Sequence, residues 1–402
     1  MICARLVSLV AALLLMPAVV SATDARRVIH ITPNGDGRRD GSDWNNAAIL
    51  AQLTTLLAHA EPNARVEIKA DLGAYDVARP IAIRNGGSPG RPVVVTGVDG
   101  AGRPAPARIV GTRSSPYSPK AAPGSDVFRL LGGANHLRFE NLAFVNQGNG
   151  CFSIGADIRD IAINNVTAHN VRRFIENFAA RGAKSASVDG LVVTQTQVRG
   201  YSKGAIRLQY DSRNILLEDV IGDSEHQDGD DFAEGVALLG SVHDVVMRRV
   251  TMRNSRDTLH EYWNGDGFAT EADTYRIRFE DTVGAGNTDA GYDIKSNDVQ
   301  LVRAVAKDNK HNFKFWGRAI VLSDCIGRSP HRRGGTGVQD QMEIAQGADV
   351  AVTNCRFVDT DPSTTIFHVA TGARLRVRNT TVSKNKDASM SMVAEGGLLT
   401  IE

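Results

Sequence analysis

One short pattern recurs ten times between residues 137 and 379 of this 402-residue chain. Each copy reads apolar-x-apolar-x-polar, and the polar residues that close successive copies, called anchors here, are 21 to 32 residues apart. Apolar residues at alternate positions are typical of strands with one buried face. The sequence therefore predicts stacked strands at 137–141, 161–165, 191–195, 215–219, 245–249, 277–281, 299–303, 320–324, 350–354 and 375–379.

The length of the repeat narrows the fold further. A propeller blade needs about 40–45 residues, and leucine-rich or helical solenoids need a helical segment in each repeat, which this pattern lacks. A parallel β-helix remains, in which each coil contributes two or three short strands that stack about 4.8 Å apart. Parallel crossovers are overwhelmingly right-handed. We therefore expect an all-β, single-stranded right-handed parallel β-helix from about residue 64 to 402.

A different pattern precedes the strands. Residues 44–60 have apolar side chains at helical spacing, and Ser42 or Asp43 is available as the N-cap. An exposed first coil would leave an open core and unpaired strand edges. We therefore predict a capping helix at about 44–60, at the N-terminal end of the β-helix.

The first 22 residues have the features of a secretory signal peptide. Arg5 precedes an apolar run from Leu6 to Val20, and small residues follow it. A membrane anchor is the alternative, but the run is shorter than the about 20 residues that a span needs. We expect cleavage after residue 22, a single domain over 23–402, no membrane span, and a secreted or periplasmic protein.

The charge balance restricts the possible partners. The 46 Lys and Arg residues offset the 45 Asp and Glu residues, so no global field attracts nucleic acid or an anionic membrane. An anionic ligand must then be held by a local site. We expect a monomer that binds no nucleic acid.

Three cysteines remain if Cys3 leaves with the signal peptide, and an odd number argues against a disulfide framework. Cys325 and Cys355 each follow an anchor by one residue, which predicts neighbouring inward positions on successive coils. Parallel Cβ directions would strain a bond between them. We favour stacked buried thiols, with a disulfide as the alternative.

Charged residues gather around a recurring aromatic between Trp263 and Gly317. The aromatic is Phe268, then Tyr292, then Phe313. Polar residues of this kind also simply form turns. If the segments are equivalent strands, however, four charged side chains meet on one face: Asp266, Asp289, Asp293 and Lys314.

These segments also resemble a known family. The stretches N-G-D-G-F (264–268), G-N-T-D-A-G-Y-D (286–293) and N-F-K-F-W-G (312–317) are similar to the signature of pectate lyases of polysaccharide lyase family nine, which have the pectin-lyase-like β-helix. The resemblance implies that Asp266, Asp289 and Asp293 bind Ca²⁺. It also implies that Lys314 is the base that removes the substrate's C5 proton.

One departure concerns calcium. Such lyases usually have two adjacent aspartates where this chain has Asp289 followed by Ala290. Fewer carboxylates should weaken calcium binding. We consider Asp230, Asp231 and Glu234, one repeat earlier, as sources of the missing ligand.

The implied reaction suits these residue types. β-Elimination of a 4-linked uronic acid takes a weakly acidic proton from the carbon beside the carboxylate. Calcium is a hard cation that binds oxygen and acts as a Lewis acid. The ordinary pKa of lysine is about 10.4, and a neighbouring cation or desolvation lowers it towards the range of a useful base.

Five further basic residues are candidates for binding a uronate carboxylate or a neighbouring sugar. Each also has an ordinary interpretation as a solvated strand or loop residue. Lys295 is in addition an alternative base, and Trp263 and Trp316 are candidates for stacking on sugar rings. The five are Lys295, Arg332, Arg333, Lys203 and Arg207.

The sequence thus favours an extracytoplasmic lyase that acts on an anionic, uronate-containing polysaccharide. Two alternatives stay open. One is a carbohydrate-binding β-helix without catalysis. The other is an inverting glycoside hydrolase of the same fold, with paired aspartates as acid and base.

Overall fold

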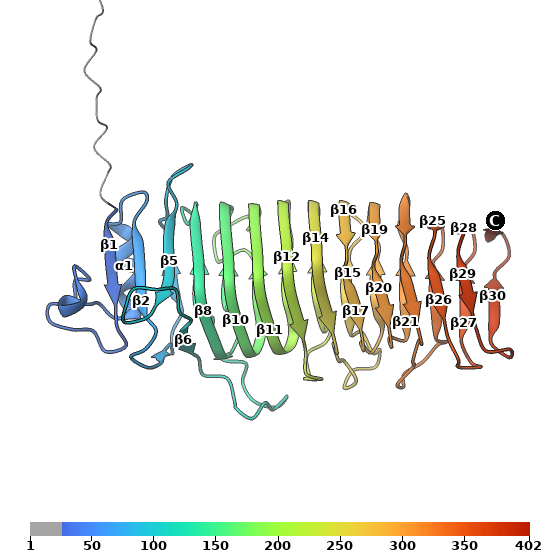
Figure 1. The fold of residues 1–402 in the computed structure, drawn as a ribbon, viewed down its shortest axis with the longest axis horizontal. Coiled ribbons are helices and arrows are strands. Elements are labelled where there is room, and N and C mark those ends of the chain that lie inside the picture. Colours follow the sequence, from blue (N-terminus) through green and yellow to red (C-terminus); the bar gives the residue numbers. More distant parts are fainter. Residues whose placement is uncertain (1–25) are drawn as a thin grey trace, which may run out of the picture.

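The computed structural model describes residues 26–402, which form one elongated stack of parallel strands (Figure 1). Every ladder between named strands is parallel, and the chain winds through the strands coil by coil from β1 to β31. The predicted fold class, a right-handed parallel β-helix, is confirmed. The signal peptide predicted at residues 1–22 lies outside the described residues. No helix between residues 26 and 402 is long and apolar enough to span a membrane.

The first of three sheets runs the full length of the stack. Its strands are β1 (Val28–Ile31), β2 (Arg65–Lys69), β5 (Val93–Val98), β8 (Leu137–Gln147), β10 (Ile158–Asn177), β11 (Val188–Leu208), β12 (Arg213–Asp223), β14 (His243–Arg253), β16 (Tyr275–Glu280), β19 (Asn297–Val302), β22 (Ile320–Ser323), β25 (Asp349–Thr353), β28 (Arg374–Arg378) and β31 (Leu398–Ile401).

The long strands β8, β10, β11, β12 and β14 bend and continue into the second sheet, and β10 and β11 continue into the third. The other strands of the second sheet are β3 (Tyr75–Asp76), β6 (Ala107–Val110), β17 (Val283–Ala285), β20 (Val305–Lys307), β23 (Ile326–Arg328), β26 (Arg356–Val358) and β29 (Thr381–Ser383).

The third sheet carries the predicted site. Its other strands are β4 (Ile81–Ile83), β7 (Phe128–Leu130), β9 (Phe152–Ile154), β13 (Glu234–Leu238), β15 (Asp266–Thr270), β18 (Ala290–Ile294), β21 (His311–Phe315), β24 (Asp340–Ile344), β27 (Thr365–Val369) and β30 (Ser389–Val393).

The ten predicted repeats are the first-sheet strands from β8 to β28, and each pairs with the next in the predicted register. All ten anchors have φ between 46° and 57°, the left-handed region that Asn and Asp tolerate best. They lie where the chain bends from the first sheet to the second. The polar residue of the repeat is therefore the residue that makes this bend.

The anchors also contact one another from coil to coil. Asn165 donates to Asn141 (2.7 Å), and Arg303 binds Asp281 (2.6 Å). Inside the coils, aliphatic and aromatic side chains form one continuous core from Ile29 to Val377. The bends thus stack as regularly as the strands.

The N-terminal end differs from the prediction in two ways. β1 pairs in parallel with β2, so the stack begins near residue 28 and not near 64. The predicted helix at 44–60 is interrupted. Asp43 caps a short 3₁₀ turn, η1 (Trp44–Asn46); a second turn, η2 (Leu50–Gln52), follows, and α1 spans only Leu53–Ala58. Between the two turns Ala48 forms a parallel bridge with Ile31, so the segment pairs with the edge of β1 instead of continuing as a helix.

Cys325 and Cys355 are free and buried, as favoured from the sequence. The Cys325 N–H donates to the Cys355 Sγ (3.2 Å), and their flanking strands β23 and β26 are in register. Burial also raises the pKa of the third thiol, Cys151. The thiols are therefore core residues of the coils.

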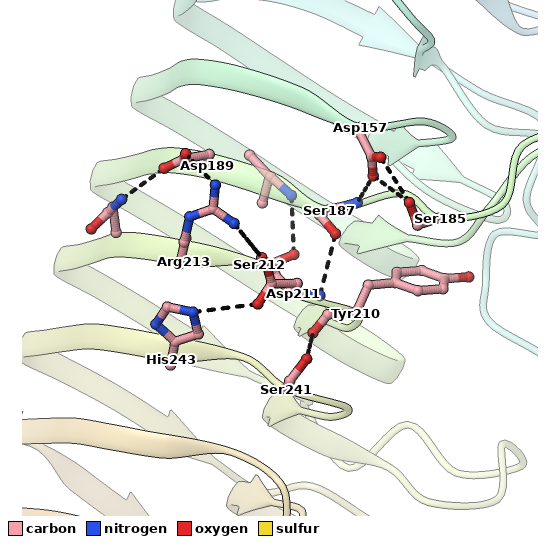
Figure 2. A network of polar contacts seen from close by, with 12 residues as sticks. Asp157, Ser185, Ser187, Asp189, Tyr210, Asp211, Ser212, Arg213, Ser241 and His243 are labelled. Atoms are coloured by element: carbon pink, nitrogen blue, oxygen red, sulfur yellow. Dashed lines mark hydrogen bonds and ion pairs between the residues drawn. The ribbon is translucent and has the colours of Figure 1, made fainter.

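The turns differ in length around the coil. Short polar turns lead from the third sheet back to the first, and Figure 2 shows one such region, where Arg213 binds both Asp189 (2.8 Å) and Asp211 (2.7 Å) and Ser187 accepts from the Asp211 N–H. Four long turns, 111–127, 224–233, 254–265 and 329–339, lead from the second sheet to the third. They project along one edge of the stack (lower edge of Figure 1).

Candidate functional site

The predicted site lies on the outer face of the third sheet, on strands β15, β18 and β21. Phe268, Tyr292 and Phe313 are paired on these strands and point inward, with ring centroids 4.9 Å and 5.3 Å apart. This aromatic stack is part of the core and fixes the strands beneath the site. Asp293 and Lys314, each one residue further along, are paired on the outer face, as the spacing from the anchors predicts.

Three carboxylates converge there. Asp266 begins β15, Asp289 directly precedes β18, and Asp293 lies within β18. One oxygen of each lies within 4.8 Å of those of the other two, and none of the three residues is more than 6% exposed. We call these residues the acid triad. The sequence reasoning that placed them on one patch is consistent with this geometry.

Lys314 joins the triad through Asp289. Its Nζ donates to Asp289 Oδ2 (3.0 Å), while Lys310 Nζ lies 3.3 Å from Asp289 Oδ1. The Tyr262 hydroxyl, from the 254–265 turn, lies 3.3 Å from both Asp289 oxygens and from Lys314 Nζ. Asp289 is thus the centre of the polar contacts at the site.

Asp266 has fewer partners. Its Oδ1 accepts the backbone N–H of Ala290 (2.7 Å). Glu234 is paired with Asp266 on the preceding strand, β13. Of the three residues considered as the missing ligand, Glu234 is therefore in line with the triad. Asp230 instead binds Arg172 (2.7 Å), and Asp231 lies with Asp257 and His260.

The indole of Trp316 borders the third carboxylate. Its Nε1 donates to Asp293 Oδ1 (2.8 Å), and the side chain is still 42% exposed. The Trp316 ring centroid lies 5.6 Å from Lys314 Nζ. An aromatic face beside the buried charges is therefore open to a ligand.

The charges at the site shift one another's pKa values. Burial raises the pKa of Asp266, and the charges of Asp289 and Asp293 add to this effect. Burial also raises the pKa of Asp293. Burial has the same effect on Asp289, but Lys314, His311 and Lys310 outweigh it and lower its pKa. Burial lowers the pKa of Lys314, but Asp289 and Asp293 outweigh it, so the lysine is firmly protonated in this arrangement.

The triad fits a hard dication. Three buried carboxylates offer up to six oxygens, and calcium takes six to eight. Burial raises the pKa of both Asp266 and Asp293 more than the neighbouring cations lower it, so a bound dication would stabilise their charged forms. Lys314 and Lys310 both bind Asp289, so this carboxylate is the one of the three that is held directly by ammonium groups.

The predicted substrate-binding residues take different positions. Arg207 on β11 is in the same column of the outer face as Asp293 and Lys314, through Ala237 and Ala269. Lys203 Nζ contacts the carbonyl of Asp231 and lies 5.7 Å from the ring of Phe232. Arg207 and Lys203 therefore extend a basic region from the triad towards the N-terminal coils.

The other three are engaged by the protein itself. Lys295 binds Glu271 (2.8 Å) at the edge of the site. Arg333 binds Asp308 (2.5 Å), and Arg332 donates to Gly337 O within its own turn (2.5 Å). Binding of a uronate by these residues stays a prediction. Arg333 would have to release Asp308 before it could bind a uronate carboxylate.

Sequence reasoning missed the roles of Tyr262, Lys310 and His311 at this site. Lys310 and His311 lie in the D-N-K-H-N stretch, but their spacing matches no ligand motif. Tyr262 lies in a long turn outside the repeat, so no register places it. The one available signal was its position four residues before Asp266 in a segment already identified as important.

A well-formed concavity lies elsewhere on the molecule. It has a volume of about 380 Å³ and is lined by residues of the polar turns shown in Figure 2, among them Asp157, Asp189 and Arg213. Its charged groups are largely paired with one another. We therefore place the candidate site at the acid triad, where buried charges are incompletely balanced.

Comparison with known proteins agrees on the architecture. The sequence matches no protein-family model and no curated protein. The structure is similar to pectate lyase Pel9A (TM-score 0.52, 14% identity, 92% of this chain and 79% of that one). It is also similar to the A-module of the Azotobacter vinelandii mannuronan C-5 epimerase AlgE4 (0.51, 11%, 83% and 91%). A third similar structure is the catalytic domain of a GH87 alpha-1,3-glucanase (0.55, 12%, 93% and 69%). At these identities the likeness is one of fold.

Proposed function

We propose that this protein is a carbohydrate-active enzyme that cleaves a uronate-containing polysaccharide by β-elimination, with Lys314 as the base. The observation that carries the proposal is the position of Lys314 Nζ, 3.0 Å from Asp289 in a cluster of three converging buried carboxylates. The fold is shared with a pectate lyase, an epimerase of mannuronan and a glucanase. These neighbours support a polysaccharide as the substrate class.

The acid triad is the proposed holder of Ca²⁺. Bound calcium would supply a Lewis acid for the substrate carboxylate and would compensate the carboxylates that hold the proton on Lys314. Lys314, next to the exposed ring of Trp316, is the proposed acceptor of the C5 proton. Trp316 presents an aromatic face to a sugar ring next to this position.

Elimination also needs a proton for the departing sugar oxygen. Tyr262 is the candidate donor, because its hydroxyl lies 3.3 Å from Lys314 Nζ and the side chain is 43% exposed. Burial, followed by the charge of Asp289, raises its pKa to about 12, so the phenol stays protonated at neutral pH. A base and an acid are thus neighbours on one side of the triad.

A direct test is to incubate the full-length protein with polygalacturonate, alginate and other uronate polymers and to follow the ultraviolet absorbance of the unsaturated uronate. We expect the absorbance to rise with calcium and to stop with chelator. Single Asp→Ala changes in the triad should raise the calcium concentration required. New reducing ends without this absorbance would contradict the lyase assignment.

A hydrolase is the second candidate, because burial raises the pKa of Glu234 to about 7. A carboxylic acid that stays protonated near neutral pH is suited to protonate a glycosidic oxygen. Under this alternative Glu234 would be the acid and a triad carboxylate the base. Binding of polysaccharide without any new chain ends would instead indicate a carbohydrate-binding β-helix.

A further inference from the structure

A second group of metal-ligating side chains lies beyond the acid triad on the same outer face. His311 is on β21, Asp340 and Glu343 are on β24, and His368 is on β27. His311 pairs with Asp340, and Glu343 pairs with His368. We propose that these four residues form a second cation site, separate from the triad, that takes a dication of the Zn²⁺ class.

The side-chain nitrogen and oxygen atoms of these residues lie close to one another. His311 Nδ1 lies 2.9 Å from Asp340 Oδ1 and 3.3 Å from Glu343 Oε2. His368 Nδ1 lies 3.7 Å from Asp340 Oδ2. One ligand atom each from His311, Asp340 and Glu343 lies within 4.8 Å of the others. Residues from two successive coils therefore meet there, and His368 of the next coil approaches them through Asp340.

Two of these atoms are buried without a hydrogen-bond partner: Asp340 Oδ2 and His368 Nδ1. Asp340 is completely buried, and a buried carboxylate oxygen left unpaired is costly. Their separation of 3.7 Å is too long for a hydrogen bond. Two ligands about 2.1 Å from one Zn²⁺ at a tetrahedral angle would lie roughly 3.4 Å apart. The pair is therefore spaced like two ligands of one ion.

The donor set distinguishes this group from the triad. Two imidazoles and two carboxylates suit zinc and similar transition metals, whereas a set of carboxylates alone suits calcium. The two carboxylates also balance the charge of a dication. Glu343 and His368 have side chains 23% and 27% exposed, so an ion can enter from solvent.

His311 connects the two clusters. Its Nδ1 faces Asp340 and Glu343, while its Nε2 lies 3.7 Å from Asp289 Oδ1 in the triad. Metal-binding histidines commonly turn their other ring nitrogen towards a carboxylate, which fixes the ring. Asp289 is in the position of that carboxylate. The proposal does not depend on lyase activity, because its ligands are not in the triad.

The test uses full-length protein stripped with chelator and then titrated with Co²⁺ in saturating Ca²⁺. We expect one Co²⁺ per chain by equilibrium dialysis, with visible absorption typical of low coordination number, and displacement by Zn²⁺. His368→Gln and Asp340→Asn should each weaken Co²⁺ binding at least tenfold. The matched control is His331→Gln. His331 is an exposed histidine of the 329–339 turn that contacts Asp308, and this variant should bind Co²⁺ like the wild type.

Asp266→Asn tests whether the two sites are distinct, since it should impair calcium binding and leave Co²⁺ binding unchanged. Circular dichroism checks that each variant is folded. If Asp340→Asn does not fold, His368→Gln, at a partly exposed position, carries the test. Absence of Co²⁺ binding in the wild type, or equal affinity in His368→Gln, would overturn the proposal and leave a purely hydrogen-bonded network.

Discussion

Asp293 and Lys314 occupy the same position on the neighbouring strands β18 and β21, so a carboxylate and an ammonium stack directly on the outer face of the third sheet. Lys314 is nevertheless only 6% exposed, because Tyr262 and Trp316 flank it. Because Lys314 is buried, its replacement is expected to affect the stability of the protein as well as its activity.

Lys314→Ala should abolish eliminative cleavage and also lower stability when calcium is removed. Losing one partner of a buried ion pair leaves an unbalanced charge, and here Lys310 and Tyr262 still contact Asp289, so we expect a loss of about 1–3 kcal/mol. Added calcium should restore most of it. Thermal unfolding with and without chelator measures this. Lys307→Ala, at an exposed lysine on β20 of the second sheet, is the control and should show neither effect.

Tyr262→Phe should lower kcat by about 10²–10⁴-fold and change KM little, because it removes one proton donor and keeps the ring. Initial rates over a range of substrate concentrations separate the two constants. Tyr275→Phe, on the first sheet where the ring stacks on His243, is the matched control. A Tyr262→Phe enzyme with unchanged kcat would remove the hydroxyl from the reaction.

Glu234 should make stability depend on pH in the absence of metal. Burial raises its pKa from an ordinary 4.5 to about 7, so between these values the folded protein binds more protons than the unfolded chain. The free energy of unfolding due to this residue should therefore fall as the pH rises from 4.5 to 7. Glu234→Gln should remove this part of the slope, measured by denaturant unfolding at several pH values. Parallel profiles for the two proteins would show that Glu234 titrates normally.

Arg207→Ala should raise KM for an anionic polysaccharide and leave kcat nearly unchanged. Arg207 is in the column of Lys314 but four strands away, so it is placed to bind the chain and not the reacting sugar. The effect should shrink at high salt, which screens charge attraction. Arg278→Ala on the first sheet, where the guanidinium binds Gln300, tests for a general loss of charge.

The repeat predicted correctly which residues of the candidate site are neighbours on adjacent strands. Asp293 and Lys314 stand ten residues before their anchors, Arg303 and Asp324, and equal spacing gave the correct pairing. The alternation of apolar and polar side chains does not predict that the anchors have positive φ. Asn and Asp at many of these positions are consistent with it, because their short polar side chains tolerate the left-handed conformation.

Prediction failed where local pattern and tertiary contacts compete. Residues 44–60 have helical periodicity, but Ala48 pairs with Ile31, because the edge of β1 offers unpaired backbone groups. Tyr262 reaches Asp289 from a turn that obeys no period. Contacts of this kind depend on how a turn folds back over the sheet, which neither spacing nor composition encodes.

The turns between the second and third sheets can change in sequence and length independently of the strands that hold the charged residues. Strands that pair in register from coil to coil hold the triad and Lys314 on them or directly next to them. The 254–265 and 329–339 turns lie outside these ladders and touch each other, since a Cβ at Gly334 would lie 2.2 Å from the Trp263 ring. Lengthening either turn leaves every strand in register. A relative with the same charged residues and Tyr262 but a different 329–339 turn would then keep the proposed reaction and accept another polymer, so selection can alter the choice of substrate without rebuilding the proposed catalyst.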